Sequence, residues 1–163
     1  MRMPRFHPSP RIPILLSLCF LLGASLAVNG CSLPKIIILK DPLTPEEHLN
    51  LGVAYEKQGE FDAAIKEYES AAKKLPLAHL YLGNVYFQKN EWGQAEKSYR
   101  RAIRKEPGQA DAYNNLAWLY YLKKENLDEA ETLALKAMEL NPGKIQLYQD
   151  TLEKIRELKK GGS

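Results

Sequence analysis

Hydrophobic and polar residues recur with a helical period in three successive segments of the chain, which end at Pro76, Pro107 and Pro142. The first half of each segment carries a leucine followed by a small residue, with a tyrosine three positions later, and the second half carries two alanines seven residues apart. Because such positions lie on one face of a helix, each segment predicts two amphipathic helices. The matching positions are Leu51, Gly52 and Tyr55, then Leu82, Gly83 and Tyr86, then Leu116, Ala117 and Tyr120, with the alanine pairs Ala64 and Ala71, Ala95 and Ala102, and Ala130 and Ala137.

Glycine, asparagine and proline residues indicate where these helices end and where they meet. Gly59 and Asn90 fall between paired halves and accept the left-handed backbone of a helix C-terminus. The prolines at the ends of the segments stop the second helices. Gly52 and Gly83 lie inside first helices, where glycine costs up to about 1 kcal/mol relative to alanine. We therefore expect each of them to allow a close approach of the paired helix.

The apolar stripe continues after the third segment. Tyr148, Leu152 and Ile155 keep the same spacing and predict a seventh helix over residues 143–158, with a charged opposite face. A stacked array needs such a capping helix at its open end. Residues 159–163 predict a flexible tail.

The three segments resemble tetratricopeptide repeats (TPRs), which are helix-turn-helix units of about 34 residues. The resemblance implies an all-α fold, a right-handed α-solenoid with repeats at residues 45–76, 77–107 and 108–142, followed by the capping helix. The chain departs from the family pattern at the fourth repeat position, where the usual tryptophan is replaced by His48, His79 and Tyr113. The third unit also has one extra residue in its turn.

The first 30 residues carry a different pattern. Three arginines precede an apolar run from Ile12 to Val28, which is followed by small residues. This order is typical of a secretory signal peptide. The run of about 17 residues is near the lower limit for a membrane-spanning helix, so a retained anchor helix is the alternative.

The stretch from Val28 to Cys31 resembles the processing site of bacterial lipoprotein precursors, although Asn29 is larger and more polar than is usual there. The resemblance implies that residues 1–30 are cleaved off, that Cys31 is lipidated, and that the protein is anchored in the bacterial outer membrane facing the periplasm. Ser32 after the cysteine favours the outer membrane. Residues 31–44 would then be a tether. Its apolar run at residues 36–39 leaves two alternatives open, packing on the domain or pairing as a strand with a partner.

The net charge argues against one class of partner. The arginines of the first eleven residues account for the formal charge of +3, so residues 31–163 carry no net charge. A chain without an overall positive field is not expected to bind nucleic acid. The basic run from Lys97 to Lys105 falls on a second helix, where we expect a solvated outer face rather than a site for anionic lipid or another polyanion.

No pattern of catalytic or metal-ligating residues emerges from the sequence. His48 and His79 occupy the same repeat position, so the core stripe explains both, and no third ligand has metal-site spacing. No catalytic triad order, CxxC pair or phosphate-binding loop is present. We therefore expect a protein that is not an enzyme, with no catalytic residue, no metal site, no cofactor and no small-molecule substrate.

In TPR proteins the first helices line a concave groove that binds other proteins, and the resemblance implies the same surface here. Repeats that bind the terminal carboxylate of a peptide use lysine and asparagine where this chain has Leu49 and Val53. An apolar helix or extended segment is therefore the expected ligand, and the capping helix is expected to cover part of the surface or to leave it open. The groove residues carried over from the family are Leu49, Val53, Leu80, Asn84, Phe87, Asn114, Trp118 and Tyr121.

Together these patterns predict a membrane-anchored interaction scaffold or assembly factor of the bacterial envelope, with a protein or peptide partner. Two alternatives stay open. One alternative to the scaffold is a self-associating structural protein. The other is an accessory subunit of an exported peptidase, secretion or pilus system. The peptidase alternative arises because residues 41–68 resemble the repeat-bearing tails of some exported cysteine peptidases.

Overall fold

The computed structural model describes residues 41–161 of the 163-residue chain. The expected signal peptide, Cys31 and most of the expected tether lie outside the described residues. Within them the chain forms seven α-helices and one short 3₁₀ helix, and no strand. The elements are α1 (Pro45–Lys57), α2 (Phe61–Ala71), α3 (Ala78–Gln88), α4 (Trp92–Lys105), α5 (Ala110–Lys123), α6 (Leu127–Leu140), η1 (Pro142–Lys144) and α7 (Ile145–Gly161).

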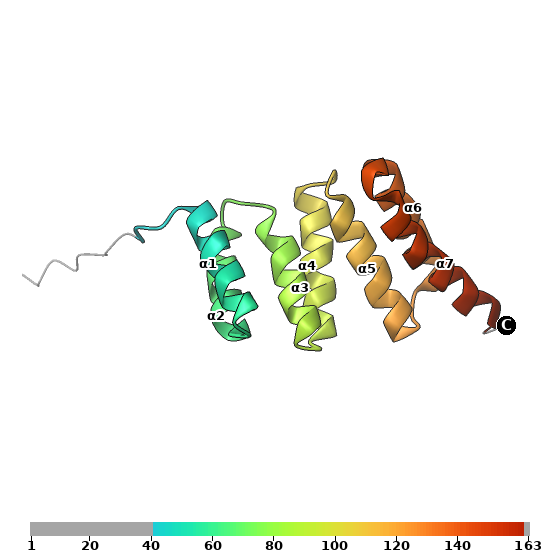
Figure 1. Ribbon diagram of the computed structural model, residues 1–163, viewed down its shortest axis with the longest axis horizontal. Helices are drawn as coiled ribbons and strands as arrows, with labels where there is room; N and C mark the ends of the chain where they lie inside the picture. The colour runs from blue at the N-terminus through green and yellow to red at the C-terminus, as the bar shows by residue number, and fades with distance from the viewer. Residues whose placement is uncertain (1–40, 162–163) are drawn as a thin grey trace, which may run out of the picture. The chain divides into compact units, whose positions relative to one another are not determined.

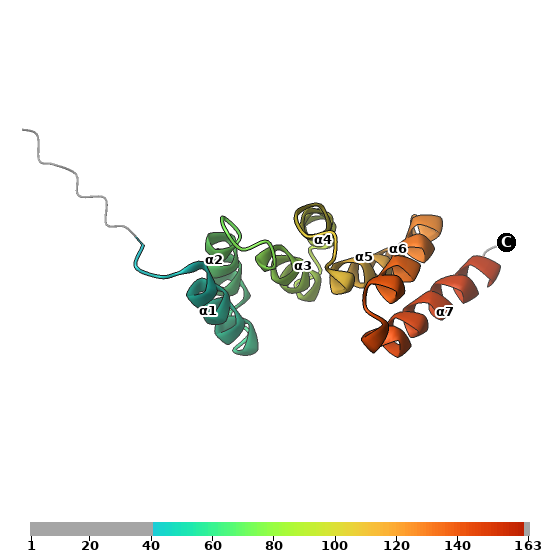
Figure 2. The same cartoon turned by 90° about the horizontal axis from the view of Figure 1, so that it is seen from above.

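The helices pack as three consecutive pairs, α1 with α2, α3 with α4 and α5 with α6, and α7 packs on α5 and α6 (Figure 1). Seen from above, α1 and α3 lie in one layer and α2 and α4 in the other (Figure 2). Each second helix also contacts the first helix of the next pair. This arrangement confirms the predicted all-α solenoid of three helix-turn-helix units with a capping helix.

Local sequence explains where several helices begin and end. Thr44 and Glu47 form a capping box at the start of α1, with Pro45 in the first turn. Gly59 and Asn90 have φ angles of 79° and 60°, as their positions between paired helices predicted. The longer third turn contains two left-handed residues, Lys124 and Asn126.

Tyrosines and alanines dominate the core. Tyr68, Tyr99, Tyr120 and Tyr148 are the largest side chains with almost no exposed surface, and the paired alanines of every repeat are buried. A Cβ on Gly52 would lie only 2.5 Å from Cε1 of Tyr68. The glycine therefore provides the space that the ring of the paired helix occupies, which is the close approach expected from the sequence.

The capping helix is shifted toward the C-terminus relative to its predicted span. Residues Pro142–Lys144 form the 3₁₀ turn, so α7 begins at Ile145 rather than at residue 143. It continues to Gly161, which corrects the prediction that the tail begins at residue 159. Lys159 pairs with Asp128 (2.6 Å) and Glu131 (2.7 Å) of α6, and these contacts hold the last turn against the array.

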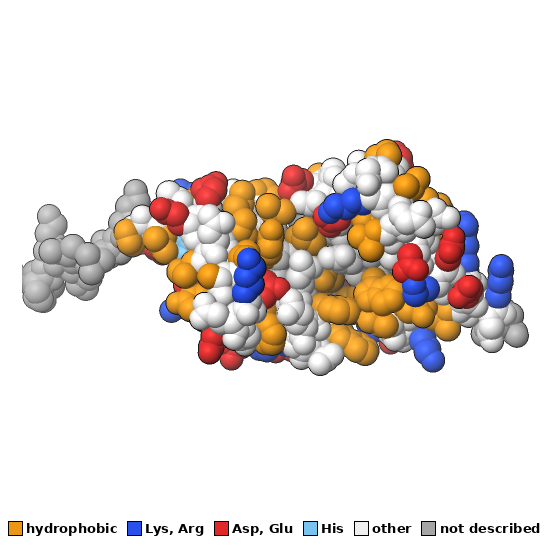
Figure 3. All heavy atoms as spheres, viewed as in Figure 1, with side chains coloured by type: hydrophobic (Ala, Val, Ile, Leu, Met, Phe, Trp, Pro, Cys, Tyr) orange, Lys and Arg blue, Asp and Glu red, His pale blue; other side chains and the backbone are white. Residues whose placement is uncertain are grey.

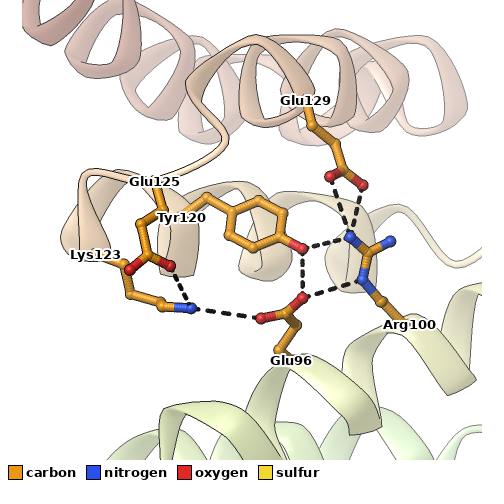
Figure 4. A network of polar contacts seen from close by, with 6 residues as sticks. All are labelled: Glu96, Arg100, Tyr120, Lys123, Glu125 and Glu129. Carbon is orange, nitrogen blue, oxygen red and sulfur yellow. Dashed lines mark hydrogen bonds and ion pairs between the residues drawn. The ribbon is translucent and has the colours of Figure 1, made fainter.

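A polar network joins the second and third helix pairs (Figure 4). The Tyr120 hydroxyl of α5 donates a hydrogen bond to Oε1 of Glu96 (2.7 Å), and Arg100 of α4 donates to the same hydroxyl. Arg100 also pairs with Glu129 of α6 (2.9 Å). Three helices therefore meet in one set of charge-assisted bonds, which are stronger than bonds between neutral groups.

Lys123 extends this network and has a counterpart one repeat earlier. It lies 3.5 Å from Glu96 of the preceding pair and 2.7 Å from Glu125 in its own turn. Lys89 makes the matching contacts with Asp62 (2.7 Å) and Glu91 (2.8 Å). The same lysine position thus connects consecutive repeats twice along the array.

Candidate peptide-binding groove

The first helices and one tyrosine of a second helix enclose a pocket of about 290 Å³. Phe87 of α3 and Trp118 of α5 supply its aromatic walls, and Asn84 and Asn115 supply polar groups. A concave surface with a few polar groups among aromatic walls is what peptide and small-ligand sites have in common. The lining residues are Glu56, Asn84, Phe87, Gln88, Tyr99, Asn115 and Trp118.

Side-chain hydrogen bonds connect successive first helices along this pocket. Gln88 of α3 donates to Glu56 of α1 (2.5 Å), and Asn115 of α5 donates to Oδ1 of Asn84 in α3 (2.9 Å). The Tyr99 hydroxyl donates to the same Asn84 oxygen (3.1 Å). These bonds occupy the Asn84 carbonyl, while the Asn84 amide N–H groups make no hydrogen bond within residues 41–161. The Asn84 amide group can therefore donate a hydrogen bond to a peptide carbonyl.

An aromatic pair borders the pocket on the α5 side. The rings of Trp118 and Tyr121 lie 4.9 Å apart between centroids and are tilted by 31°. Lys154 of α7 places its ammonium group 5.9 Å from the centroid of Trp118, within cation–π distance. Both aromatic rings remain half-exposed, so the capping helix covers the aromatic surface only in part. Hydrophobic side chains gather on the face of α5 seen in Figure 3.

A second hollow of about 310 Å³ continues the surface toward α1. It shares Glu56 and Gln88 with the first pocket and adds Val53, Lys57 and Tyr81. The two hollows together form a groove across α1, α3 and α5. We call this surface the groove.

The structure divides the expected groove residues into two sets. Asn84, Phe87 and Trp118 line the central pocket, and Val53 lines its extension. Tyr121 stacks on Trp118 at the edge, and Leu49 is half-buried against the core between α1 and α3.

Leu80 and Asn114 do not belong to the exposed surface, which corrects their assignment to the groove. Leu80 is 7% exposed and packs in the same core cluster as Leu116 of α5. Asn114 is 6% exposed, and its Oδ1 atom has no hydrogen-bond partner within residues 41–161. The neighbouring first helix covers each of these positions, since α5 packs on both α3 and α7.

Tyr99 and Asn115 line the central pocket but do not occur among the expected groove residues. Tyr99 lies on α4, a second helix, but its hydroxyl reaches Asn84 in the groove. Asn115 lies next to the expected position 114 and takes the role of the polar residue there. The only sequence signal for them is the glycine opposite Tyr99, which allows the ring to cross the helix pair.

The two histidines sit in the packed stripe, and their surroundings differ. His48 contacts Glu67 through Nδ1 (2.6 Å) and Asp41 through Nε2 (3.0 Å), and the hydrogen bond to Glu67 raises the pKa of His48. Burial lowers the pKa of His79, and the positive charge of Arg101 adds to the effect. No cluster of potential metal ligands occurs among the described residues, and no helix of residues 41–161 is long and apolar enough to cross a membrane.

Comparisons with known proteins agree with this fold. The first TPR domain of Spaghetti (RPAP3) bound to the HSP90 peptide SRMEEVD is 24% identical, has a TM-score of 0.63 and covers 74% of this chain and 96% of its own. The TPR2B domain of yeast Sti1 in a complex with pHsp70 is 16% identical, with a TM-score of 0.65 and coverages of 69% and 96%. A chain in the crystal structure of the APC/C heterotetramer Cut9–Hcn1 is 20% identical, with a TM-score of 0.61 and coverages of 68% and 23%.

No curated protein sequence matches the chain significantly. The sequence profile of the tetratricopeptide repeat family does match, over residues 36–79, 49–93 and 80–145. These matches cover more than half of the chain and together span the three helix pairs described above. The chain belongs to the tetratricopeptide repeat family.

Proposed function

We propose that this protein is an interaction scaffold that holds an apolar peptide segment or helix of a partner protein in the groove. The observation that carries the proposal is the central pocket, where half-exposed Phe87 and Trp118 face polar groups of Asn84 and Asn115. Large aromatic side chains in such a setting are the usual anchors of protein interfaces. Family membership and the two neighbouring structures solved with bound partners support protein–protein interaction as the general role.

The chemistry of the groove favours an apolar ligand over a terminal carboxylate. Leu49 and Val53 stand on α1 at the positions that lysine and asparagine occupy in carboxylate-binding repeats. The lining of the central pocket contains Glu56 and no basic residue, and Lys57 lines only the extension toward α1. An acidic peptide end would meet a like charge there, whereas an apolar side chain would fill the aromatic walls.

The anchoring part of the proposal rests on the N-terminal sequence alone. Lipidation of Cys31 after removal of residues 1–30 would hold the repeats at the periplasmic face of the bacterial outer membrane. Metabolic labelling with a palmitate analogue tests this step. We expect label in the wild type and none in Cys31→Ser, which should accumulate as the unprocessed precursor. A normally processed, unlabelled wild-type protein would contradict the anchor.

The groove is tested by photo-crosslinking in cells of the source organism, with a photoreactive amino acid at position 87. The matched control carries the same residue at position 92, because Trp92 is an exposed aromatic at the start of α4, outside the groove. We expect a protein crosslinked from position 87 and not from position 92, and its loss when Trp118→Ala is added.

Two results of this experiment would overturn the groove. Equal crosslinking from both positions would place the partner elsewhere. Crosslinks between two copies of this chain would identify self-association instead. Sedimentation of the purified protein over a range of concentrations separates that alternative, because a scaffold that binds another protein stays monomeric.

A further inference from the structure

Another hollow, of about 250 Å³ and separate from the groove, opens on the other side of the helix pairs, between the end of α2 and α4. We propose that this hollow, which we call the basic cleft, binds the phosphate groups of an anionic lipid surface. Lys73, Lys97 and Arg101 line the basic cleft, together with the acidic Glu69 and the polar Ser98. Three cations against one carboxylate give the opening a net positive charge.

These cations are available to a ligand. Lys73, Lys97 and Arg101 are exposed, and none of them makes an ion pair within residues 41–161. The contrast with the neighbouring Arg100 is direct, because that residue is held by Glu96 and Glu129. Helix α4 therefore has one face whose Arg100 is held in ion pairs and another face whose Lys97 and Arg101 are unpaired within residues 41–161.

The unpaired face extends beyond the basic cleft along α4. Positions 97, 101 and 104 are four and three residues apart, so Lys97, Arg101 and Arg104 lie on one side of the helix. Lys105 follows in the last turn, and both Arg104 and Lys105 are exposed and unpaired within the described helices. A row of cations fits an extended anionic surface better than a single small anion.

His79 adds a neutral hydrogen-bonding group to the wall of the basic cleft. It is 6% exposed, and no hydrogen bond to its ring occurs among the described residues. Burial lowers the pKa of His79, and the positive charges of Arg101, Lys105 and Arg104 lower it further. A neutral imidazole carries one N–H donor. The wall therefore supplies a donor in addition to positive charge, which is the chemistry that phosphate oxygens require.

The position of the N-terminal connection selects the lipid surface as the source of phosphate. Asp41 is the first described residue. It lies close enough to Lys73 for the positive charge of Lys73 to help lower the pKa of Asp41. Ten residues of extended chain, from Cys31 to Asp41, span at most roughly 35 Å. This step rests on the proposed lipid anchor at Cys31. An anchored chain would keep Asp41 within that distance of the bilayer, and would keep Lys73, at the edge of the basic cleft, near it.

Docking in this way would leave the groove accessible to a partner. The basic cleft is formed by residues of α2, α3 and α4, whereas the groove runs across α1, α3 and α5. The basic cleft and the groove have no lining residue in common. A lipid-bound α4 would therefore not compete with the partner.

The test uses the full-length protein, purified from membranes with its own anchor, in two kinds of vesicle. One is made of phosphatidylcholine, and the other is an equal mixture of phosphatidylcholine and phosphatidylglycerol. Mass spectrometry then measures acetylation of Lys97 and Lys73 by a water-soluble reagent, with the exposed Lys57 of α1, which lies outside the basic cleft, as the internal reference. We expect roughly fivefold slower acetylation of Lys97 and Lys73 on the anionic vesicles, since surface potential acts on each basic residue.

Matched variants separate charge from folding. Lys97→Glu with Arg101→Glu should abolish the protection of Lys73, whereas Lys124→Glu with Lys160→Glu, an equal charge change outside the basic cleft, should retain it. High salt should remove the protection, because it screens the attraction. Circular dichroism verifies that both double variants keep their helices.

The outcomes distinguish this proposal from the anchor on which it rests. Protein bound to both kinds of vesicle with equal acetylation of Lys97 would overturn the lipid-binding cleft and leave the anchor intact. Protein bound to neither would overturn both. Protection by a soluble polyglutamate peptide, without protection by anionic vesicles, would show that an acidic protein segment is the ligand and would overturn the lipid assignment.

Discussion

The ring of Tyr99 lies so close to Gly83 that a Cβ on residue 83 would overlap the ring. Gly52 and Tyr68 repeat this relationship in the first helix pair. The third pair solves the same packing differently. Ala117 stands at the glycine position, Ala134 stands where the tyrosine would be, and both alanines are fully buried. A large side chain on one helix is thus matched by a missing Cβ on the other.

Replacing Gly83 by alanine should destabilise the protein. Alanine favours the helix by up to about 1 kcal/mol, but the overlap with the Tyr99 ring costs typically 1–3 kcal/mol when a packed core must shift. We expect a net loss of about 1–2 kcal/mol, which corresponds to a fall in melting temperature of roughly 5 °C. Differential scanning calorimetry measures both quantities.

Gly93→Ala is the control for this substitution. Gly93 lies in the first turn of α4, and a Cβ there would contact nothing within 4 Å. This variant should be as stable as the wild type or slightly more stable. Equal melting temperatures for the two variants would mean that the Tyr99 ring moves aside without cost.

The helix pairs could be predicted because the same pattern of buried side chains recurs within each short segment of the sequence. Each first helix presents the same leucine, small residue and tyrosine, and a spacing of this kind depends only on helix geometry. The turn residues Gly59 and Asn90 were readable for the same reason, since a left-handed backbone is a property of one residue. Patterns within each short segment are therefore enough to predict the fold.

The groove could be predicted only in part, because its surface depends on contacts between repeats. Helical position gives the direction of a side chain, but it does not say what covers it, and the adjacent helix covers Leu80 and Asn114. Tyr99 reaches the groove by crossing over Gly83, and no pattern within α4 indicates that reach. Long side chains and neighbouring helices therefore set the limit of the prediction.

Glu96→Gln should weaken the connection between the second and third helix pairs. Burial disfavours the Glu96 charge, yet hydrogen bonds from Tyr120 and Arg100 outweigh it and lower the pKa of Glu96. Glutamine keeps one oxygen and replaces the other by an NH2 group, so it can accept from Arg100 and Tyr120 or from Lys123 but not from both sides, and it removes the negative charge that both cations face. We expect a loss of about 1–3 kcal/mol in the free energy of unfolding, measured by urea denaturation.

The charge of Glu96 also gives this loss a pH dependence. A carboxylate with a lowered pKa stabilises the fold above the unfolded value, near pH 4.3, and the contribution disappears as the pH falls through the folded value. Glu96→Gln and the wild type should therefore become more alike in strongly acidic solution. Glu157→Gln, at an exposed residue of α7, is the control and should change stability little. A constant difference between Glu96→Gln and the wild type at every pH would contradict the role of the charge.

The capping helix should be required for the stability of the third pair. Ile155 is fully buried against the core that contains Leu116 and Ala134. Ile155→Ala should lower the free energy of unfolding by about 2–5 kcal/mol, the usual cost of such a cavity. Leu147 lies on the same helix and is 56% exposed, so Leu147→Ala should stay within about 0.5 kcal/mol of the wild type. Similar effects of both substitutions would indicate that α7 is not docked.

Trp118 can report directly on the groove. The chain has two tryptophans, so Trp92→Phe leaves Trp118 as the sole emitter. An apolar segment of the partner identified by crosslinking should shift the emission to shorter wavelengths as it excludes water from the half-exposed ring. The carboxylate-ended peptide SRMEEVD should leave the emission unchanged, because Leu49 and Val53 provide no charge for it. A shift caused by SRMEEVD would contradict the apolar ligand.

His48 and His79 should give the protein two opposite pH dependences, although they occupy the same repeat position. The hydrogen bond to Glu67 raises the pKa of His48. A raised pKa stabilises the fold fully below the unfolded value, near pH 6.5, and the contribution is lost as the pH rises through the folded value. Burial lowers the pKa of His79, so its contribution is present above about pH 6.5 and is lost as the pH falls through the folded value.

Thermal unfolding of His48→Gln and His79→Gln, from about pH 5 to about pH 9, separates the two contributions. Relative to the wild type, His48→Gln should lose most stability in acid and progressively less as the pH rises. His79→Gln should gain relative stability as the pH falls below about 6.5, because it removes a group that resists protonation. Each variant serves as the control for the other, since the substitution and the repeat position are the same. Parallel pH profiles for the two variants would mean that Asp41 and Glu67 do not hold His48 in its charged form.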